Sequence, residues 1–114
     1  MDDCIFCKIA SGEIPAALEY DTPDVIAFRD LNPQSPIHIL VIPREHIQSL
    51  MDLGETESDL LLSMIEAAQE VARKTGIADG GFRLVTNVGP DAGQSVPHLH
   101  WHVLGGRMMK WPPG

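Results

Sequence analysis

The sequence predicts an α+β domain in which a five-stranded antiparallel sheet is combined with one long helix and a short N-terminal helix. Five short runs lie between turn residues and have the length of strands. One segment repeats apolar residues at the spacing of an amphipathic helix. With 114 residues, the chain has the size of one compact domain. We therefore expect a single domain over residues 1–114.

The first 30 residues predict a helix followed by a hairpin. Residues 4–11 are interpreted as a short helix that is closed by Gly12. Two strand candidates follow, at residues 17–21 and 25–30, and Thr22-Pro23-Asp24 separates them. Because this tripeptide is typical of a turn, the two strands are expected to pair in antiparallel fashion.

The middle of the chain predicts the third strand and the main helix. Residues 37–42 are rich in β-branched residues and are followed by Pro43, which is expected to stop the strand. Thr56-Glu57-Ser58-Asp59 resembles a capping box, which predicts a helix start. The helix is expected to run to Gly76, and its apolar residues at helical spacing are Leu60, Leu61, Met64, Ile65, Ala68, Val71 and Ala72.

The last third of the chain predicts two further strands and an irregular tail. A turn at Asp79-Gly80-Gly81 precedes a strand over 82–87. A glycine-bearing loop over 89–94 leads to the fifth strand, over 98–104. The ending Trp111-Pro112-Pro113-Gly114 cannot continue a strand or a helix, so the tryptophan must dock elsewhere or stay exposed.

The charge balance limits the classes of partner. Eight basic residues against 16 acidic ones give a net charge of −8, which argues against a nucleic-acid-binding protein. A small phosphate ligand remains compatible with this charge, because backbone N–H groups and imidazoles can bind an anion locally. No run of apolar residues is long enough for a membrane span, and the acidic start of the chain is unlike a signal peptide. We therefore expect a cytoplasmic protein without a membrane partner.

Three of the five histidines occupy alternate positions, at His98, His100 and His102. In an extended strand such side chains point to one face, while Leu99 and Trp101 point to the other. Free histidine titrates near pH ~6.5, so a row of imidazoles offers both lone pairs and proton donors at neutral pH. The row can therefore both attack a phosphate and hold it.

A metal site or a solvated strand would also explain three alternating histidines, and the surrounding residues bear on the choice. Residues 94–104 contain no Asp or Glu, which a zinc hydrolase usually supplies as a base. Gly93, Gln94 and Ser95 directly precede the row, and their N–H groups and hydroxyl could approach a phosphate. These features favour nucleophilic imidazole chemistry.

The segment Gln94-Ser95-Val96 followed by His98-x-His100-x-His102-Val103-Leu104 resembles the signature of the histidine triad (HIT) family. Residues 27–30, residues 38–43 and the ending from Gly105 to Gly114 resemble the Hint branch of that family. The resemblance implies a HIT-like fold and a purine nucleoside phosphoramidase, which cleaves the P–N bond of adenosine-type 5′-phosphoramidates. The enzyme that the resemblance implies needs no cofactor for catalysis.

The resemblance also implies roles for individual residues. His100 matches the nucleophile that forms a covalent nucleotidyl-histidine intermediate. His102 and Ser95 match groups that contact the phosphate oxygens or the leaving group, whereas His98 and His38 match supporting positions. Without the resemblance, a buried structural role for His38 is an equally good interpretation.

Nucleotide-binding positions follow from the same resemblance. Asp30 matches a carboxylate that accepts hydrogen bonds from the ribose, and Asn87 matches a polar residue near the sugar and phosphate. The positions expected to bind the nucleotide are Phe6, Ile9, Phe28, Asp30, Leu31, Asn87, Gly93, Gln94, Ser95, His100, His102 and Trp111. From the residues alone, the apolar members could be ordinary core and Asp30 a turn carboxylate.

Cys4-Ile5-Phe6-Cys7 contains the only cysteines. This spacing in a cytosolic protein indicates a redox pair or half of a zinc site, and the short preceding segment disfavours a thioredoxin-type redox motif. Resemblance to bacterial members implies a structural zinc held by Cys4, Cys7, His46 and His98. A metal-free, reduced pair is the alternative.

Two other functions compete with phosphoramidate hydrolysis. One is hydrolysis of dinucleoside polyphosphates, and the other is a non-catalytic, nucleotide-binding regulator. In each case the expected partners are derivatives of purine nucleoside monophosphates. The Hint resemblance further implies a homodimer in which residues 108–114 of one chain reach the active site of the other.

Overall fold

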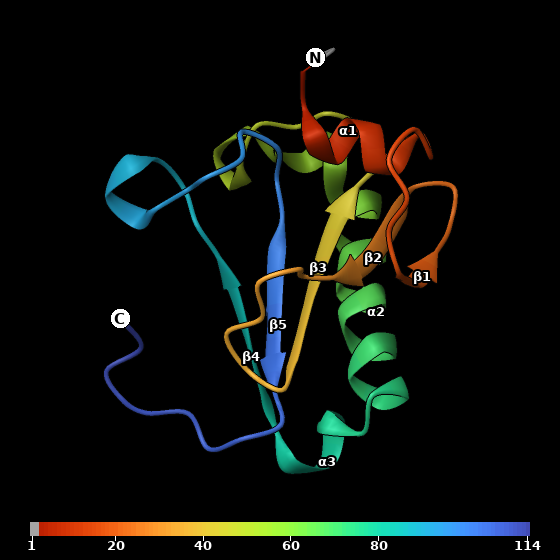
Figure 1. Ribbon diagram of the computed structural model, residues 1–114. Helices are drawn as coiled ribbons and strands as arrows, with labels where there is room; N and C mark the ends of the chain where they lie inside the picture. The colour runs from red at the N-terminus through yellow and green to blue at the C-terminus, as the bar shows by residue number, and fades with distance from the viewer. Residues whose placement is uncertain (1–2) are drawn as a thin grey trace.

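Five strands form one antiparallel sheet in the order β1-β2-β3-β5-β4 in the computed structural model, which describes residues 3–114. The helix α2 covers one face of the sheet, and α1 lies across the end where β3 finishes (Figure 1). The strands are β1 (Leu18–Asp21), β2 (Val25–Arg29), β3 (Ile37–Pro43), β4 (Phe82–Thr86) and β5 (Trp101–Gly105). The helices are α1 (Ile5–Ala10), α2 (Ser58–Lys74) and α3 (Ile77–Gly80), with 3-10 turns at Leu50–Asp52, Glu55–Glu57 and Pro90–Ala92. The α+β fold predicted from the sequence is confirmed.

The two faces of the sheet carry separate cores, because side chains alternate along each strand. Towards α2, Val41 and Val103 pack against helix residues such as Met64 and Val71. Towards α1, Phe28 and Leu40 lie in a second cluster that includes Phe6. The site residues lie on the α1 side, so α2 serves to bury the opposite face.

The main helix begins differently from the sequence prediction. The expected capping box over residues 56–59 does not form, since Glu57 occupies the N-cap of α2 without any side-chain bond to it. The Glu57 carboxylate instead accepts a hydrogen bond from the N–H of Gly54 at 3.2 Å. A 3-10 turn over Glu55–Glu57 precedes the helix and uses this acidic side chain. Among residues 3–114, no helix has the length and apolar character needed to cross a membrane.

The fifth strand starts later than predicted, at Trp101 rather than at His98. Trp101 pairs with Val41 of β3, and the register would set Leu99 opposite Pro43. Proline has no N–H to donate, so regular pairing cannot extend there. The Leu99 N–H bonds instead to the carbonyl of Ile47 at 2.6 Å. The alternation of faces nevertheless holds, because Leu99 and Trp101 are buried in the core beneath α2.

The N-terminal helix α1 is held at both of its ends. At its start, Cys4 is the N-cap, and its sulfur accepts a hydrogen bond from the Cys7 N–H at 3.4 Å. At its end, the guanidinium of Arg44 donates to the carbonyl of Ala10. Gly12 follows the helix with φ +82°, a conformation that glycine adopts without strain. The short helix predicted at residues 4–11 is therefore present as Ile5–Ala10.

Candidate active site and metal centre

His100 lies just before β5 and is 4% exposed. Its Nδ1 lies 2.7 Å from the carbonyl oxygen of His98, and Thr86 donates a hydrogen bond to the carbonyl of His100 at 3.1 Å. A carbonyl oxygen can only accept, so Nδ1 carries the proton. In the neutral ring the lone pair is therefore on Nε2. This tautomer leaves Nε2 as the atom that can attack an electrophile.

His102 is linked to His38 on the adjacent strand. The backbone N–H of Gln34 donates to His38 Nδ1 at 3.0 Å, so this nitrogen is unprotonated in the neutral ring. His38 Nε2 must then carry the proton, and it lies 2.8 Å from His102 Nδ1. His102 consequently has its own proton on Nε2. The pair thus leaves His102 with one free N–H donor. The centroid of the His102 ring lies 5.1 Å from that of the His100 ring.

Burial and crowding keep these imidazoles uncharged. Burial, together with charge repulsion from His100 and His38, lowers the pKa of His102 to about 4, although the Asp30 carboxylate opposes the shift. Burial also lowers the pKa of His38, although the Asp30 carboxylate opposes the effect. The pKa of His98 is lowered mainly by burial. At neutral pH these three rings are therefore neutral, which agrees with the tautomers assigned to His38 and His102 from their hydrogen bonds.

An apolar cavity of about 340 Å³ opens between α1 and the strands β2 and β3. The structure brings together six of the predicted nucleotide-binding residues in its lining, namely Phe6, Ile9, Phe28, Asp30, Leu31 and Ser95. We call this cavity the base slot. Phe6 connects the slot to the histidines, because its ring contacts that of Phe28 at 5.7 Å and that of His100 at 5.1 Å between centroids. Leu31 is fully exposed at the rim of the slot.

Asp30 marks the polar end of the slot. One of its carboxylate oxygens accepts a hydrogen bond from the Asn32 N–H at 2.8 Å, and the other lies 3.4 Å from His38 Nε2. The carboxylate therefore acts as a turn acceptor, as one interpretation of the sequence expected, while its second oxygen faces the histidine pair. Its side chain is 22% exposed and so remains accessible to a ligand.

The loop before the histidines is held by its own amides. The Gln94 side chain accepts from the Gly89 N–H at 3.0 Å and donates to the carbonyls of Gln48 and Val96. The N–H groups of Gly93 and Gln94 donate to carbonyls within the loop. These two N–H groups are thus already used, contrary to the expectation that they approach a phosphate.

Asn87 and Ser95 flank this loop and differ in how free their side chains are. The Asn87 amide donates to the carbonyl of Ala92 at 2.7 Å, so its nitrogen helps to shape the loop. Ser95 is exposed and lines the base slot. Its hydroxyl is therefore the side-chain donor that this loop presents to the slot.

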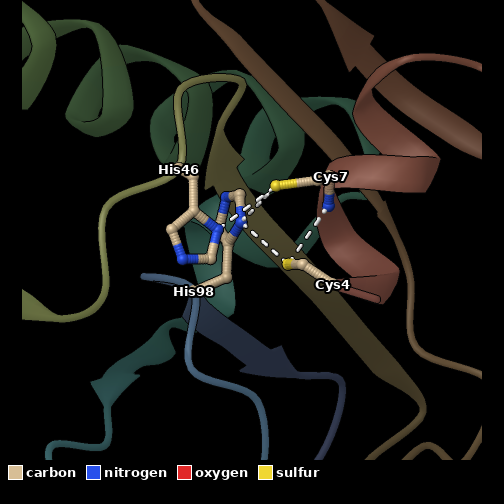
Figure 2. A group of neighbouring side chains, drawn as sticks. All are labelled: Cys4, Cys7, His46 and His98. Atoms are coloured by element: carbon tan, nitrogen blue, oxygen red, sulfur yellow. Dashed lines mark hydrogen bonds between the residues drawn. The ribbon is translucent and has the colours of Figure 1, made fainter. Parts of the chain in front are cut away.

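Cys4, Cys7, His46 and His98 form the second feature of the site, which we call the Cys–His cluster. Figure 2 shows both sulfurs directed towards the two imidazoles, with Cys7 on α1, Cys4 at its N-cap and each histidine on a separate loop. Cys7 Sγ lies 3.2 Å from His46 Nδ1 and 3.5 Å from His98 Nδ1. Cys4 Sγ lies 3.4 Å from His98 Nδ1. The four residues that the sequence analysis grouped thus converge in space.

The Cys–His cluster has the geometry that a tetrahedral zinc requires. Zinc bonds of about 2.3 Å to sulfur and about 2.0 Å to nitrogen separate such ligands by about 3.5 Å, close to the distances in the cluster. The Nε2 of His98 lies 2.9 Å from the Pro43 carbonyl, so Nε2–H donates there and the Nδ1 lone pair faces the sulfurs. Burial raises the pKa of the Cys7 thiol, and the Cys4 thiol raises it further. The donors present therefore fit a structural metal.

Asp30, His38 and His102 also gather ligand atoms within 4.8 Å of one another. The 2.8 Å separation of His38 Nε2 and His102 Nδ1 is that of a hydrogen bond, and both tautomers agree with one. The hydrogen-bonded arrangement therefore accounts for this group without a metal.

Trp111 lies apart from the base slot of its own chain. It is 81% exposed, and the guanidinium of Arg83 lies 5.9 Å above its ring. The tail that carries it runs beside β4, where Arg83 also donates to the carbonyl of Lys110. Trp111 therefore does not line the slot of its own chain.

Sequence reasoning missed several parts of the site. Ile5, Ile14, Leu40 and Val96 line the base slot in addition to the expected residues. Their apolar character gave no specific signal, because ordinary core residues look the same. The Gln34 N–H, which fixes the tautomer of His38, was also missed, since a backbone donor has no sequence signature.

Comparison with known proteins agrees with this geometry. The sequence profile of the HIT domain matches residues 11–109. A 14 kDa zinc-binding protein from Brassica juncea is 47% identical, covering 98% of this chain and 100% of that protein. Adenylylsulfatase HINT1 from Arabidopsis thaliana is 46% identical, covering 96% of this chain and 76% of that protein.

Solved structures agree as well. The crystal structure of a HIT family hydrolase from Legionella pneumophila Philadelphia 1 matches with a TM-score of 0.95 and 46% identity, covering 98% of this chain and 100% of that one. A HIT family hydrolase from Clostridium thermocellum matches with a TM-score of 0.94 and 44% identity, covering 96% of each chain. The profile and these relatives span most or all of the chain, which therefore belongs to the HIT domain family, within its Hint-like branch.

Proposed function

We propose that this protein hydrolyses the P–N bond of purine nucleoside 5′-phosphoramidates through a covalent nucleotidyl-His100 intermediate. One observation carries the proposal. The Nδ1 proton of His100 is committed to the carbonyl of His98 at 2.7 Å, so the neutral ring presents its lone pair at Nε2. As Nε2 bonds to phosphorus the ring becomes cationic, and its hydrogen bond to the carbonyl strengthens.

The reaction then proceeds in two displacements. The His100 Nε2 lone pair attacks phosphorus, the P–N bond of the substrate breaks, and the leaving nitrogen takes a proton and departs as an amine. Water then attacks phosphorus, the P–Nε2 bond breaks, and the nucleoside monophosphate is released. The His102 Nε2–H donates to a phosphoryl oxygen in both steps. In the first step the exposed Ser95 hydroxyl gives its proton to the leaving nitrogen, and in the second step the attacking water returns a proton to the Ser95 oxygen.

The base slot suits a purine nucleoside. Its aromatic walls, Phe6 and Phe28, can contact a flat base, and its volume of about 340 Å³ is that of a small-molecule site. Asp30 at the polar end can accept hydrogen bonds from ribose hydroxyls. The relative named adenylylsulfatase HINT1 supports an adenylyl group on the substrate. The loop that closes this site is shaped by Asn87, Gly93 and Gln94. We assign Trp111 to the site of a partner chain.

Parallel turnover measurements test this proposal. The substrates are adenosine 5′-phosphoramidate, lysyl-adenylate, adenylyl sulfate and a diadenosine polyphosphate. We expect the phosphoramidates to be hydrolysed fastest, and His100→Ala to lower their turnover about a thousandfold or more while nucleotide binding persists. Faster cleavage of the polyphosphate would favour the alternative hydrolase. Absence of turnover with retained AMP binding would favour a regulator, and more than about a tenth of wild-type turnover in His100→Ala would contradict the mechanism.

We further propose that the Cys–His cluster holds a structural zinc ion, which would cross-link α1 to the loops that carry His46 and His98. The relative from Brassica juncea is named a zinc-binding protein, which supports this assignment. Zinc takes no part in the two displacements, which use only side chains and water. Both cysteines are free thiols, which suits the reducing cytoplasm, where we propose that the protein resides.

A further inference from the structure

We propose that metal binding at the Cys–His cluster and nucleotide binding in the base slot are thermodynamically coupled, so that each increases the affinity for the other. This inference rests on the proposed nucleotide site and on the proposed zinc. The two sites share one helix, one histidine-to-histidine contact and one stretch of cavity wall. Each of these connections is formed by described residues.

The first connection is α1, which contributes to both sites. Cys4 and Cys7 supply two of the four donors of the cluster, and Phe6 lies between them in the sequence. On the same helix, Phe6 and Ile9 form part of the wall of the base slot. A helix of six residues is too short to be stable by itself, so its position depends on its anchors. A metal that holds the two sulfurs therefore also fixes the slot wall.

The anchors at the two ends of α1 differ in kind. Its last residue is held by Arg44, whose guanidinium also donates to the carbonyl of Thr22 and pairs with Asp21. None of these contacts involves a donor of the Cys–His cluster. At the first turn, the contacts of Cys4 and Cys7 with the two imidazoles involve sulfur, which is a weak hydrogen-bonding atom. The first turn is therefore the part of α1 that metal binding orders.

The second connection joins His98 to His100. The Nδ1 of His98 faces the sulfurs of the cluster, while its carbonyl accepts the proton of His100 Nδ1 at 2.7 Å. The Phe6 ring contacts both imidazoles, with centroids 5.9 Å from His98 and 5.1 Å from His100. A metal that fixes the His98 ring thus also restrains the residue that orients the nucleophile.

The third connection is a shared wall. A cavity of about 370 Å³ opens onto Cys4 and His46 of the cluster. Ile5, Ser95 and Val96 line both this cavity and the base slot. A ligand that orders these three residues from the slot side therefore orders the surroundings of the cluster as well.

These contacts determine the sign of the coupling. Whichever ligand binds first bears the entropic cost of ordering the first turn of α1 and the shared wall, and the second ligand binds without that cost. Thermodynamic linkage requires that zinc strengthen AMP binding by the same factor by which AMP strengthens zinc binding. Couplings of this kind typically amount to about 5-fold to 150-fold. We expect a factor of at least about 5.

Isothermal titration of AMP into zinc-loaded and chelator-treated protein tests the coupling, with circular dichroism to check that the latter stays folded. The reciprocal experiment measures the zinc dissociation constant by chelator competition with and without saturating AMP. We expect both ratios to reach at least about 5 and to agree with each other. Smaller or unequal ratios would overturn the coupling. Failure of AMP to bind the zinc-loaded protein would instead contradict the proposed function and remove the coupling with it.

Two further measurements guard against a loss of folding and against zinc acting elsewhere. In protein loaded with Co²⁺, the cobalt absorption bands should shift when AMP is added, whereas an unchanged spectrum would overturn the coupling. In the Cys4→Ser, Cys7→Ser double variant, zinc should leave AMP affinity unchanged. Zinc bound at Asp30, His38 and His102 would instead compete with AMP and lower its affinity in both proteins, and that result would overturn the proposal.

Discussion

The reactive nitrogen of His100 is selected by a single backbone acceptor. The carbonyl of His98 takes the proton on Nδ1 and leaves the Nε2 lone pair free. The same logic applies to His38 and His102, where the Gln34 N–H fixes the first ring and thereby the second. Three backbone or ring contacts thus assign one nucleophile and one donor, and no carboxylate of residues 3–114 hydrogen-bonds to the His100 ring.

The low pKa of His102, about 4, predicts a loss of stability in acid. Between pH ~6.5 and ~4 the unfolded chain binds protons at His102, while the folded chain does not. The unfolded state therefore binds more protons, and the free energy of unfolding should fall as the pH falls through this window. His38 acts in the same direction, because its pKa is also lowered by burial. Urea unfolding curves at several pH values measure this slope.

A His102→Gln variant provides the control for that measurement. Glutamine does not titrate, so the fall in unfolding free energy between pH ~6.5 and ~4 should be shallower in the variant than in the wild type. Equal slopes in the two proteins would show that His102 does not carry the acid sensitivity.

At the residue scale, the sequence predicted which side chains are reactive better than it predicted their hydrogen-bond partners. The alternation of His98, His100 and His102 indicated a reactive face, because strand periodicity depends only on local geometry. By contrast, the Gln94 amide is bonded to Gly89, Gln48 and Val96, and these partners depend on how the loop folds back. No local pattern contains that information.

At the scale of elements, α1 and β5 determine where the site lies. β5 begins at Trp101 because Pro43 ends the regular pairing, and this leaves His98 free to turn towards α1. The sequence predicted each element but not this boundary, since the effect of a proline on a strand 58 residues away requires the register. The missing capping box at residues 56–59 has a similar cause, because Glu57 bonds backwards to Gly54.

Zinc anchoring of α1 predicts a stability effect. Purified protein should contain about one zinc per chain, and the Cys4→Ser, Cys7→Ser variant should contain none. The variant should lose about 2.7 kcal/mol or more of unfolding free energy wherever free zinc exceeds its dissociation constant by 100-fold. Metal analysis and urea unfolding measure these quantities. Because zinc does not touch the reacting atoms, kcat should change little while KM rises. Zinc-free wild-type protein would contradict the assignment.

At the scale of the whole molecule, β4 and the adjacent tail carry exposed apolar side chains. β4 is an edge strand of the sheet, and Phe82 and Leu84 on it are exposed. Met108 and Trp111 in the adjacent tail are more exposed still. Edge strands with apolar side chains favour pairing with another chain. These features support the homodimer that the Hint resemblance implied, in which the tail of one chain serves the site of the other.

Deletion of residues 108–114 tests that arrangement. We expect the shortened protein to remain dimeric in sedimentation experiments, because β4 is retained. Its relative rates across a set of phosphoramidates should change, because in the proposed dimer the tail contacts the leaving group of the partner's substrate. Unchanged relative rates would contradict a role of the tail in the active site. A full-length protein that sediments as a monomer at micromolar concentration would contradict the dimer.

The global fold could be predicted from the sequence because turns, strand lengths and helix periodicity are local properties. The convergence of Cys4 and Cys7 with His98 could not be derived from those properties, since it joins positions 94 and 91 residues apart. The family resemblance suggested it, and so did the fact that His46 and His98 are the histidines least required for attack on phosphate. The shared wall between the cluster and the base slot has no counterpart in any motif, and it required the folded chain.

The stereochemistry at phosphorus tests the covalent mechanism most directly. A single diastereomer of an adenosine 5′-phosphoramidothioate would be hydrolysed in ¹⁸O-labelled water, and the configuration of the product determined. Two successive displacements, one by His100 and one by water, each invert phosphorus, so we predict net retention. Direct attack by water would invert the configuration once, and net inversion would contradict a nucleotidyl-His100 intermediate.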